Sequence, residues 1–331
     1  MTAPNPAAAG SASRVVIALG GNAIAPAGKG GTADEQRRNI GSAMERVATL
    51  VAGGHEVVLT HGNGPQVGNL LLKNDLAKDI VPPMPLDWCV AQTQATIGAT
   101  ICTTLEEALD DVDLPLAVIP LISRVRVDPD DPAFAAPAKP VGRYLADEDE
   151  VAAQMERTGE QWVRQGERGW RRVVPSPQPV ELLDGMSLRL VLGAGAVVVA
   201  NGGGGIPMMR DAHGRLHGVE AVIDKDLSGV LLALHVGAEA FVVLTDVPGV
   251  AVDYGTSEER WLESVTPGEL RALEGGGHFA AGSMGPKVDA VARFVEQGGT
   301  RAAIGELSDP LAVVEGRAGT QVVAETAAVD R

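Results

Sequence analysis

Short apolar segments alternate with longer amphipathic segments along most of this chain, and this alternation constrains the fold more than any other feature. Residues 15–19 are apolar and mostly β-branched, which predicts a buried strand. Thr32 and Glu35 then form a capping-box pattern, and the apolar residues that follow recur at helical spacing. Residues 55–60 predict the next strand. A strand–helix–strand unit of this kind has parallel strands and a right-handed crossover.

The same alternation continues through the rest of the chain. It predicts helices over 87–109, 225–235 and 285–297, and strands over 116–121, 196–200, 240–244 and 301–304. Repeated units of this type form a sheet whose two faces are covered by helices, so the predicted fold class is α/β, a three-layer αβα sandwich with a mainly parallel sheet. With 331 residues, 45% of them hydrophobic, the chain can bury a sizeable core, and a disordered chain is excluded.

Residues 124–179 interrupt this rhythm. The segment is rich in proline, carries Trp162 and Trp170, and crowds its charges at 147–150. It is too long for an ordinary connection, so it predicts an inserted subdomain or lid. Residues 1–13 are rich in Ala, Pro and Ser and lack the basic and apolar regions of a signal peptide, which predicts a disordered tail.

Charge and cysteine usage limit the partners and the compartment. The formal net charge of -16 argues against a nucleic-acid partner and against adhesion to an anionic membrane. No run approaches the roughly 20 apolar residues of a membrane span. Cys89 and Cys102 match neither a CxxC pair nor a zinc spacing, so we interpret them as buried thiols in a reducing compartment. The sequence therefore predicts a cytoplasmic protein.

Three glycine-rich turns follow predicted strands directly, at 20–22, 62–64 and 202–205. Glycine lets backbone N–H groups approach an anion, and the helix that follows adds its positive end. Glycine also makes ordinary turns, but three such turns after strands favour a phosphate-binding site. The sequence contains no dinucleotide fingerprint, P-loop, serine-hydrolase elbow or HExxH metal pattern. His61 fits a turn residue better than a catalytic base.

Lysine is scarce, since only six of the 27 basic residues are lysine. Arginine can replace lysine where a solvated charge suffices, so the retained lysines mark positions where a compact ammonium is needed. Lys225 and Lys287 begin predicted helices, where a lysine opposes the helix dipole unless an anion lies nearby. Prolines on both sides of Lys139 would hold its ammonium in place. The alternatives are a surface salt bridge from Lys225 to a neighbouring aspartate and a solvated loop lysine at position 139. Solvated positions are expected for Lys29, Lys73 and Lys78.

Several long motifs together resemble one family. They are ALGGNA at 18–23, THGNGPQVGN at 60–69, RRVVPSPQP at 171–179, GGGGIP at 202–207, GVEAVIDKD at 218–226 and AGSMGPK at 281–287. In combination they resemble the carbamate kinase branch of the amino acid kinase family, from about residue 14 to residue 323. Other amino acid kinases share the glycine turns but lack the segments at 60–69 and 171–179.

The resemblance implies a fold, a reaction and an assembly. The fold would have a sheet of roughly eight strands, an N-terminal acceptor lobe at 14–215 with the protruding lid at 124–179, and a C-terminal nucleotide lobe at 216–331. The reaction would be reversible phosphoryl transfer between carbamoyl phosphate and ADP, giving ATP and carbamate, in arginine catabolism through the arginine deiminase pathway. The resemblance also implies a homodimer, and Mg²⁺ held mainly by the nucleotide phosphates rather than by a protein metal site.

The resemblance also assigns roles to residues. Lys225 and Lys287 correspond to the lysines that neutralise the moving phosphoryl group, Asp226 to the carboxylate that orients them, and Lys139 to the subdomain lysine that reaches over the substrate. The turns around carbamate and the transferred phosphate correspond to Gly20, Gly21, Asn22, Gly62, Asn63 and Gly203. The nucleotide site corresponds to Thr245, Asp246, Tyr254 and Met284.

Two other functions stay open. One is a kinase of the same fold with a different acceptor, and the other is a catalytically silent nucleotide-binding regulatory module. The intact lysines argue against the silent module, and no arginine stands beside the second glycine turn to anchor an acceptor such as acetylglutamate. Phosphoryl transfer needs positioning and charge neutralisation rather than a protein nucleophile, so the lack of a catalytic triad is expected. The chain departs from the family at Ala138, where Thr is common, and at Pro248, where Asp is frequent. These changes affect the expected lid and adenine contacts.

Overall fold

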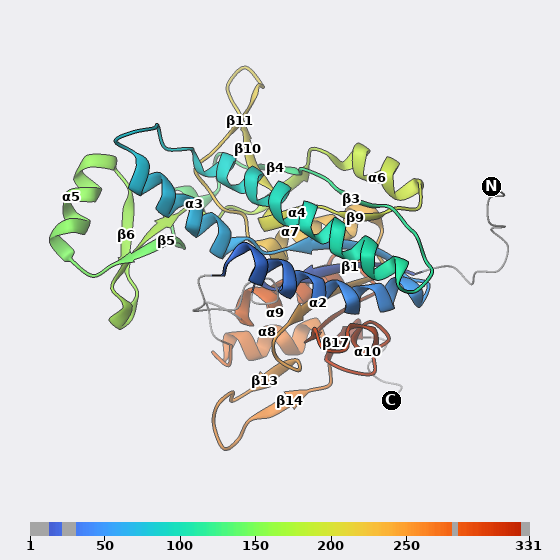
Figure 1. The fold of residues 1–331 in the computed structure, drawn as a ribbon. Coiled ribbons are helices and arrows are strands. Elements are labelled where there is room, and N and C mark those ends of the chain that lie inside the picture. The colour runs from blue at the N-terminus through green and yellow to red at the C-terminus, as the bar shows by residue number, and fades with distance from the viewer. Residues whose placement is uncertain (1–12, 22–30, 280–283, 326–331) are drawn as a thin grey trace.

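A computed structural model of the chain describes residues 13–21, 31–279 and 284–325. Its central sheet has eight strands, and neighbouring strands run parallel except for one antiparallel pair, β16 and β17. From edge to edge these are β15 (Ser264–Val265), β17 (Thr320–Val323), β16 (Arg301–Glu306), β12 (Ala240–Thr245), β1 (Arg14–Leu19), β2 (Glu56–His61), β9 (Val197–Val199) and β3 (Val118–Pro120). The mainly parallel α/β sheet predicted from the sequence is confirmed (Figure 1).

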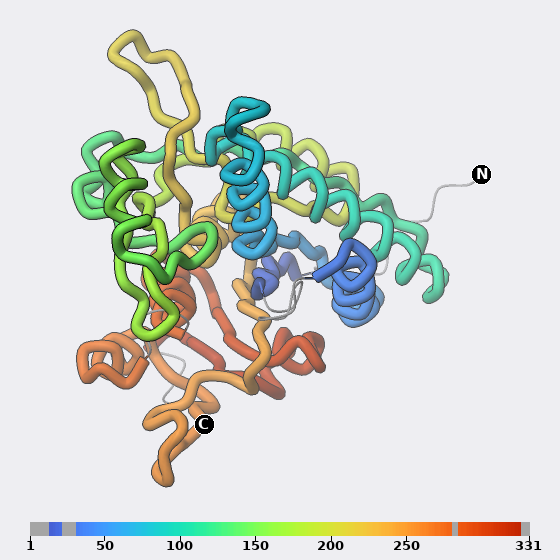
Figure 2. Tube along the Cα trace, turned by 60° about the vertical axis from the view of Figure 1, so that its left-hand side comes forward, coloured from blue at the N-terminus to red at the C-terminus, as the bar shows by residue number. Residues whose placement is uncertain are grey.

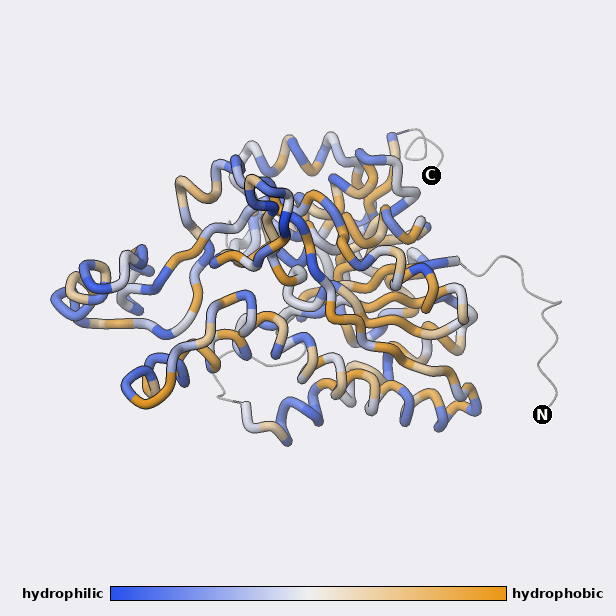
Figure 3. Tube along the Cα trace, turned by 90° about the horizontal axis from the view of Figure 1, so that it is seen from above, coloured by the Kyte–Doolittle hydropathy of each residue, from blue (hydrophilic) through white to orange (hydrophobic). Residues whose placement is uncertain are grey.

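Helices cover both faces of this sheet, because successive side chains of a strand point to opposite faces. In β1, Val15, Ile17 and Leu19 belong to the core on one face, and Val16 and Ala18 belong to the core on the other. The first core is closed by α2 (Ala33–Ala52), α4 (Leu86–Asp110) and α10 (Pro310–Val314). The second is closed by α6 (Gly185–Gly193), α7 (Lys225–Val236), α8 (Pro267–Gly275) and α9 (Met284–Glu296). Figure 3 shows the hydrophobic strands as a middle layer between the helices.

Local signals explain where the helices begin. The capping box at the start of α2 is present: Thr32 accepts the N–H of Glu35, and the carboxylate of Glu35 accepts the N–H of Thr32. Several described helices were not predicted, among them α3 (Gly64–Ala77), whose sequence opens with Gly64 and Pro65 and resembles a turn. Proline is well suited to the first turn of a helix, where its missing N–H has no partner to lose. None of the described helices is long and apolar enough to cross a membrane.

The segment at 124–179 has two structural parts. Its ends form β4 (Arg124–Val127) and β8 (Pro179–Leu182), which join β10 (Ile206–Arg210) and β11 (Leu216–Gly218) in a four-stranded sheet. Its middle forms a three-stranded sheet of β5 (Lys139–Leu145), β7 (Trp170–Val174) and β6 (Gln161–Arg164), with α5 (Glu148–Thr158). We call this middle part, 139–174, the projecting sheet, because it extends beyond the central sheet (Figures 1 and 2). A separate hairpin consists of β13 (Val250–Val252) and β14 (Arg260–Leu262).

Candidate active site

The first two glycine turns lie side by side where β1 and β2 end. Gly20 donates its backbone N–H to the carbonyl of Leu244 in β12 at 3.0 Å. A Cβ atom on Gly62 would lie 3.1 Å from the backbone N of Gly21 and 3.5 Å from Cδ of Lys225. The fold therefore brings two predicted turns and one predicted lysine to the same edge of the sheet. The third residue of the first turn, Asn22, lies outside the described residues.

The third glycine turn packs against the second. Gly203 has a positive φ of 66°, and a Cβ atom there would lie 2.0 Å from Nδ2 of Asn63. Asn63 is 5% exposed, and its Nδ2 donates to Oγ1 of Thr93 at 2.9 Å. Only glycine fits at position 203, because the backbone is left-handed and the space for a side chain is already filled. The predicted phosphate turns thus form one connected structure.

His61 is a packing residue at the end of β2, not the turn residue that the sequence suggested. Its side chain is 1% exposed, and Nδ1 lies 3.0 Å from the carbonyl oxygen of Gly62. A Cβ atom on Gly202 would lie 2.3 Å from its Nε2, so the ring closely supports the third turn. Burial, opposed by the hydrogen bond with Gly62 and aided by the charge of Lys225, lowers the pKa of His61 to about 4. The imidazole is therefore neutral at neutral pH.

Lys225 and Lys287 share one buried carboxylate. Nζ of Lys225 is hydrogen-bonded to Oδ1 of Asp226, and Nζ of Lys287 lies 3.9 Å from Oδ2. The side chains of the two lysines are 14% and 17% exposed, and that of Asp226 is 4% exposed. Burial lowers the pKa of Lys287, although Asp226 favours its ammonium form. The salt bridge from Lys225 to a neighbouring aspartate is present, but it does not lie on the surface, because Asp226 is buried and the Lys225 side chain is only 14% exposed.

Lys139 is paired as well, so the alternative of a solvated loop lysine is wrong. It begins β5, and its Nζ lies 2.8 Å from Oδ2 of Asp224. Burial alone would raise the pKa of Asp224, but the charge and hydrogen bond of Lys139 hold it below its ordinary value. We call Lys139, Lys225 and Lys287, together with Asp224 and Asp226, the lysine cluster. Sequence reasoning missed Asp224, which stood out only as a neighbour of Lys225.

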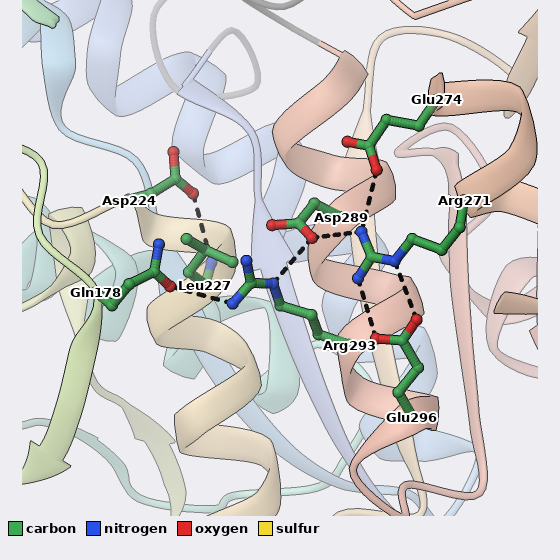
Figure 4. A network of polar contacts seen from close by, with 8 residues as sticks. All are labelled: Gln178, Asp224, Leu227, Arg271, Glu274, Asp289, Arg293 and Glu296. Atoms are coloured by element: carbon green, nitrogen blue, oxygen red, sulfur yellow. Dashed lines mark hydrogen bonds and ion pairs between the residues drawn. The ribbon is translucent and has the colours of Figure 1, made fainter. Parts of the chain in front are cut away.

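The helix that carries Lys287 is held by a network of ion pairs (Figure 4). Arg293, two turns further along α9, donates to Asp289 at 2.8 Å and to the side-chain carbonyl of Gln178 at 3.2 Å. Arg271 of α8 donates to the same Asp289 at 2.6 Å. Hydrogen bonds to Glu296 and to Asp289 raise the pKa of Arg271, so it stays charged. These contacts fix α9 against α8 and against the predicted motif at 171–179.

The four predicted nucleotide residues fall into two groups. Thr245 ends β12, and its hydroxyl donates to Oδ1 of Asp246 at 3.0 Å. The charge of Asp246 acts on Lys287, and Met284 begins the helix that carries Lys287. Tyr254 differs, because it is 65% exposed and lies in the connection between β13 and β14. Thr245 and Asp246 thus lie at the end of β12 and Met284 at the start of α9, and the charge of Asp246 reaches the lysine cluster.

Two further observations limit the nature of the site. Across the described ranges, no group of three or more His, Cys, Asp or Glu side chains could hold a metal ion. A cavity of about 360 Å³ lies between α3 and the projecting sheet, with Leu71, Val141 and Trp162 among its walls. No member of the lysine cluster lines this cavity, so it is a separate feature.

Both cysteines are buried free thiols, as predicted.

Comparison with known proteins agrees with this geometry. The amino acid kinase family matches residues 13–306. A carbamate kinase of Pyrococcus horikoshii is 44% identical over 313 residues, which covers 93% of this chain and 98% of the relative. A carbamate kinase of Haemophilus influenzae is 41% identical over 314 residues, covering 95% and 97%. The solved structure of a Giardia lamblia carbamate kinase bound to AMP-PNP has a TM-score of 0.88 at 38% identity, covering 95% of this chain and 99% of the other.

The chain belongs to the amino acid kinase family, a class of phosphoryl-transfer enzymes, and its mainly parallel sheet, covered by helices on both faces, agrees with that class. Within that family its relatives are carbamate kinases, which confirms the resemblance predicted from the sequence motifs. The chain is accordingly a kinase.

Proposed function

We propose that this enzyme is a carbamate kinase, which transfers a phosphoryl group reversibly between carbamoyl phosphate and ADP to give ATP and carbamate. The lysine cluster carries the proposal, because it gathers three ammonium groups on two carboxylates beside the glycine turns. A phosphoryl group needs such a concentration of positive charge and N–H donors. The names of the relatives support carbamate as the acceptor.

The transfer forms one P–O bond and breaks another. An oxygen of the ADP β-phosphate attacks the phosphorus of carbamoyl phosphate, and the bond from phosphorus to the carbamate oxygen breaks in line with the attack. Lys225 and Lys287 would hold opposite sides of the phosphoryl group, and Asp226 would keep both ammonium groups in place. Carbamate leaves as an anion, so no protein acid is needed to protonate it. In the reverse direction the same oxygen of carbamate attacks the γ-phosphate of ATP.

The remaining predicted residues would bind the two substrates. The glycine turns at Gly20, Gly21, Gly62, Asn63 and Gly203, with Asn22, would bind carbamate and the transferred phosphate. Thr245, Asp246, Tyr254 and Met284 would bind the nucleotide. Lys139 would cover the phosphoryl group from the projecting sheet.

Magnesium would bind through the nucleotide. Mg²⁺ is commonly held by substrate phosphates with few protein carboxylates, and no carboxylate cluster is present among the described residues. When bound, it would neutralise part of the negative charge of the nucleotide phosphates. We expect ATP formation to require added Mg²⁺.

The wider setting is part of the same proposal. The N-terminal lobe at 14–215 would hold the acceptor and the C-terminal lobe at 216–331 the nucleotide. The enzyme would act as a cytoplasmic homodimer in arginine catabolism, at the step of the arginine deiminase pathway that consumes carbamoyl phosphate. It would need no nucleic-acid or membrane partner.

A direct assay tests the proposal. Purified enzyme is incubated with carbamoyl phosphate, ADP and Mg²⁺, and ATP is measured with luciferase. ATP formation supports a carbamate kinase. ADP binding without ATP formation would favour the silent module, and phosphorylation of acetylglutamate by ATP would favour a different acceptor.

A further inference from the structure

Asp224 connects the start of α7 to Lys139 of the projecting sheet, which lies 85 residues earlier in the chain. It is the N-cap of α7, and its Oδ1 accepts the backbone N–H groups of Asp226 at 2.9 Å and Leu227 at 3.4 Å. Figure 4 shows this cap from Asp224 to Leu227. Its other oxygen, Oδ2, holds the ammonium of Lys139 at 2.8 Å. One carboxylate therefore fixes the first turn of α7 and a lysine of the projecting sheet.

The two ends of this contact differ in their freedom. The Lys139 side chain is 36% exposed and that of Asp224 is 14% exposed, so the carboxylate is the fixed partner. A lysine side chain loses considerable rotamer freedom when its ammonium is held in one place. An ammonium carries three donors, and the ion pair uses only one of them. Lys139 can therefore stay bound to Asp224 while its other donors contact an anion.

The charges around Asp224 favour its ionised form, which is the form that binds the Lys139 ammonium. Lys139 and Lys225 both favour the ionised carboxylate, and the pKa of Asp224 lies below its ordinary value despite burial. Asp224 also acts on Lys287 and favours its ammonium form. The carboxylate thus interacts with each of the three lysines, and it accepts a hydrogen bond from Lys139.

We infer that Asp224 is a positioning residue for the kinase reaction. It holds the Lys139 ammonium at the start of α7, the helix that begins with Lys225, before the phosphoryl group arrives. This role rests on the phosphoryl transfer proposed above. It adds to that proposal a carboxylate that acts through Lys139 rather than on the substrate. The projecting sheet would then hold the Lys139 ammonium in a fixed position relative to Lys225 and Lys287.

The substitution Asp224→Asn separates this role from helix capping. Asparagine caps helices about as well as aspartate, so α7 keeps its first turn, whereas the charge facing Lys139 is lost. We expect kcat/KM for ATP formation to fall about 10- to 100-fold, the range for losing a hydrogen bond to a charged group. In a Lys139→Met background the same substitution should lower kcat/KM at least severalfold less than it does in the wild-type background, because residues that act as one unit are non-additive.

Asp147→Asn is a matched control. Asp147 caps α5 by accepting the N–H groups two and three residues ahead, the same pattern as Asp224. It holds no lysine in the described structure, so this variant should keep wild-type kcat/KM. An equal loss in Asp224→Asn with and without Lys139 would overturn the inference, because the carboxylate would then act without that lysine.

A second measurement does not depend on activity. Wild type and Asp224→Asn are treated briefly with acetic anhydride, and acetylation of each lysine is measured by mass spectrometry. Lys139 should react severalfold faster in the variant, while the exposed Lys73 should react equally in both proteins. Unchanged Lys139 reactivity would show that the pair does not form and would refute the inference. A wild type without kinase activity but with this reactivity change would contradict only the proposed function.

Discussion

Replacing Asp226 with asparagine removes the negative charge that Lys225 and Lys287 share. Breaking a buried ion pair by removing one partner typically costs about 3–5 kcal/mol. The two lysine side chains keep 14% and 17% exposure, so we expect the lower end, about 3 kcal/mol. For a chain of this length that loss lowers the midpoint of thermal unfolding by roughly 4 °C.

The assay is thermal unfolding in a buffer without phosphate or sulfate, followed by titration with inorganic phosphate. An anion that binds only the folded state stabilises it by mass action. In Asp226→Asn the anion also replaces the missing carboxylate, so phosphate should raise the midpoint of the variant more than that of wild type. Asp34→Asn is the matched control, because Asp34 forms an exposed ion pair with Arg37 on α2. This control substitution should change the free energy of unfolding by no more than about 0.5 kcal/mol.

A clear result would refute this reasoning. If Asp226→Asn unfolds at the wild-type temperature and phosphate raises both midpoints equally, the carboxylate does not hold the two lysines. The same variant should also lose about 100-fold in kcat, because misplaced ammonium groups no longer stabilise the transferred phosphoryl group. A variant with wild-type stability and wild-type kcat would show that Asp226 has no role in the site.

Three further predictions concern the turns and the titrating groups. Gly203→Ala should destabilise the protein by at least about 3 kcal/mol in urea unfolding, because left-handed strain adds to a Cβ only 2.0 Å from Asn63; Gly214→Ala, equally left-handed but in open space, should cost only about 1 kcal/mol. Because the pKa of His61 is lowered to about 4 in the folded state, protonation favours the unfolded chain, and the free energy of unfolding falls as the pH drops below 6.5, by about 2 kcal/mol between pH 7 and pH 5. Urea unfolding of His61→Gln should lack this pH-dependent loss. An identical loss in both proteins would contradict the prediction. Because burial lowers the pKa of Lys287 and its ammonium is the working form, kcat/KM should decline as pH rises at values below the ordinary 10.5, and a profile flat through pH 10.5 would contradict that role.

The elements that the sequence predicted correctly are those whose local signals agree. In β1 the apolar run and the glycines that end it favour the same strand, and in α2 the capping box coincides with the helical period. The start of α3 was missed because Gly64 and Pro65 favour a turn by composition, although proline is also compatible with a helix start. The division of 124–179 between two sheets was missed because it depends on pairing with β10, which lies far along the chain.

The candidate site was only partly predictable for the same physical reason. Lys225 and Lys287 stand out locally, since a lysine at a helix start is unfavourable without an anion. No local pattern indicates that Lys139 meets Asp224, because that contact exists only after the projecting sheet has folded against α7. The burial of His61 likewise depends on Gly202, a residue of another strand connection.

The most direct test of the lysine cluster is the rate of ATP formation from carbamoyl phosphate and ADP by Lys225→Ala. Removing a preorganised electrostatic contact to a transition state typically costs about 100- to 1,000-fold in kcat. We predict a loss of that size for Lys225→Ala, and wild-type kcat for Lys73→Ala, which removes an exposed lysine of α3. A kcat for Lys225→Ala close to that of wild type would contradict phosphoryl transfer at this cluster.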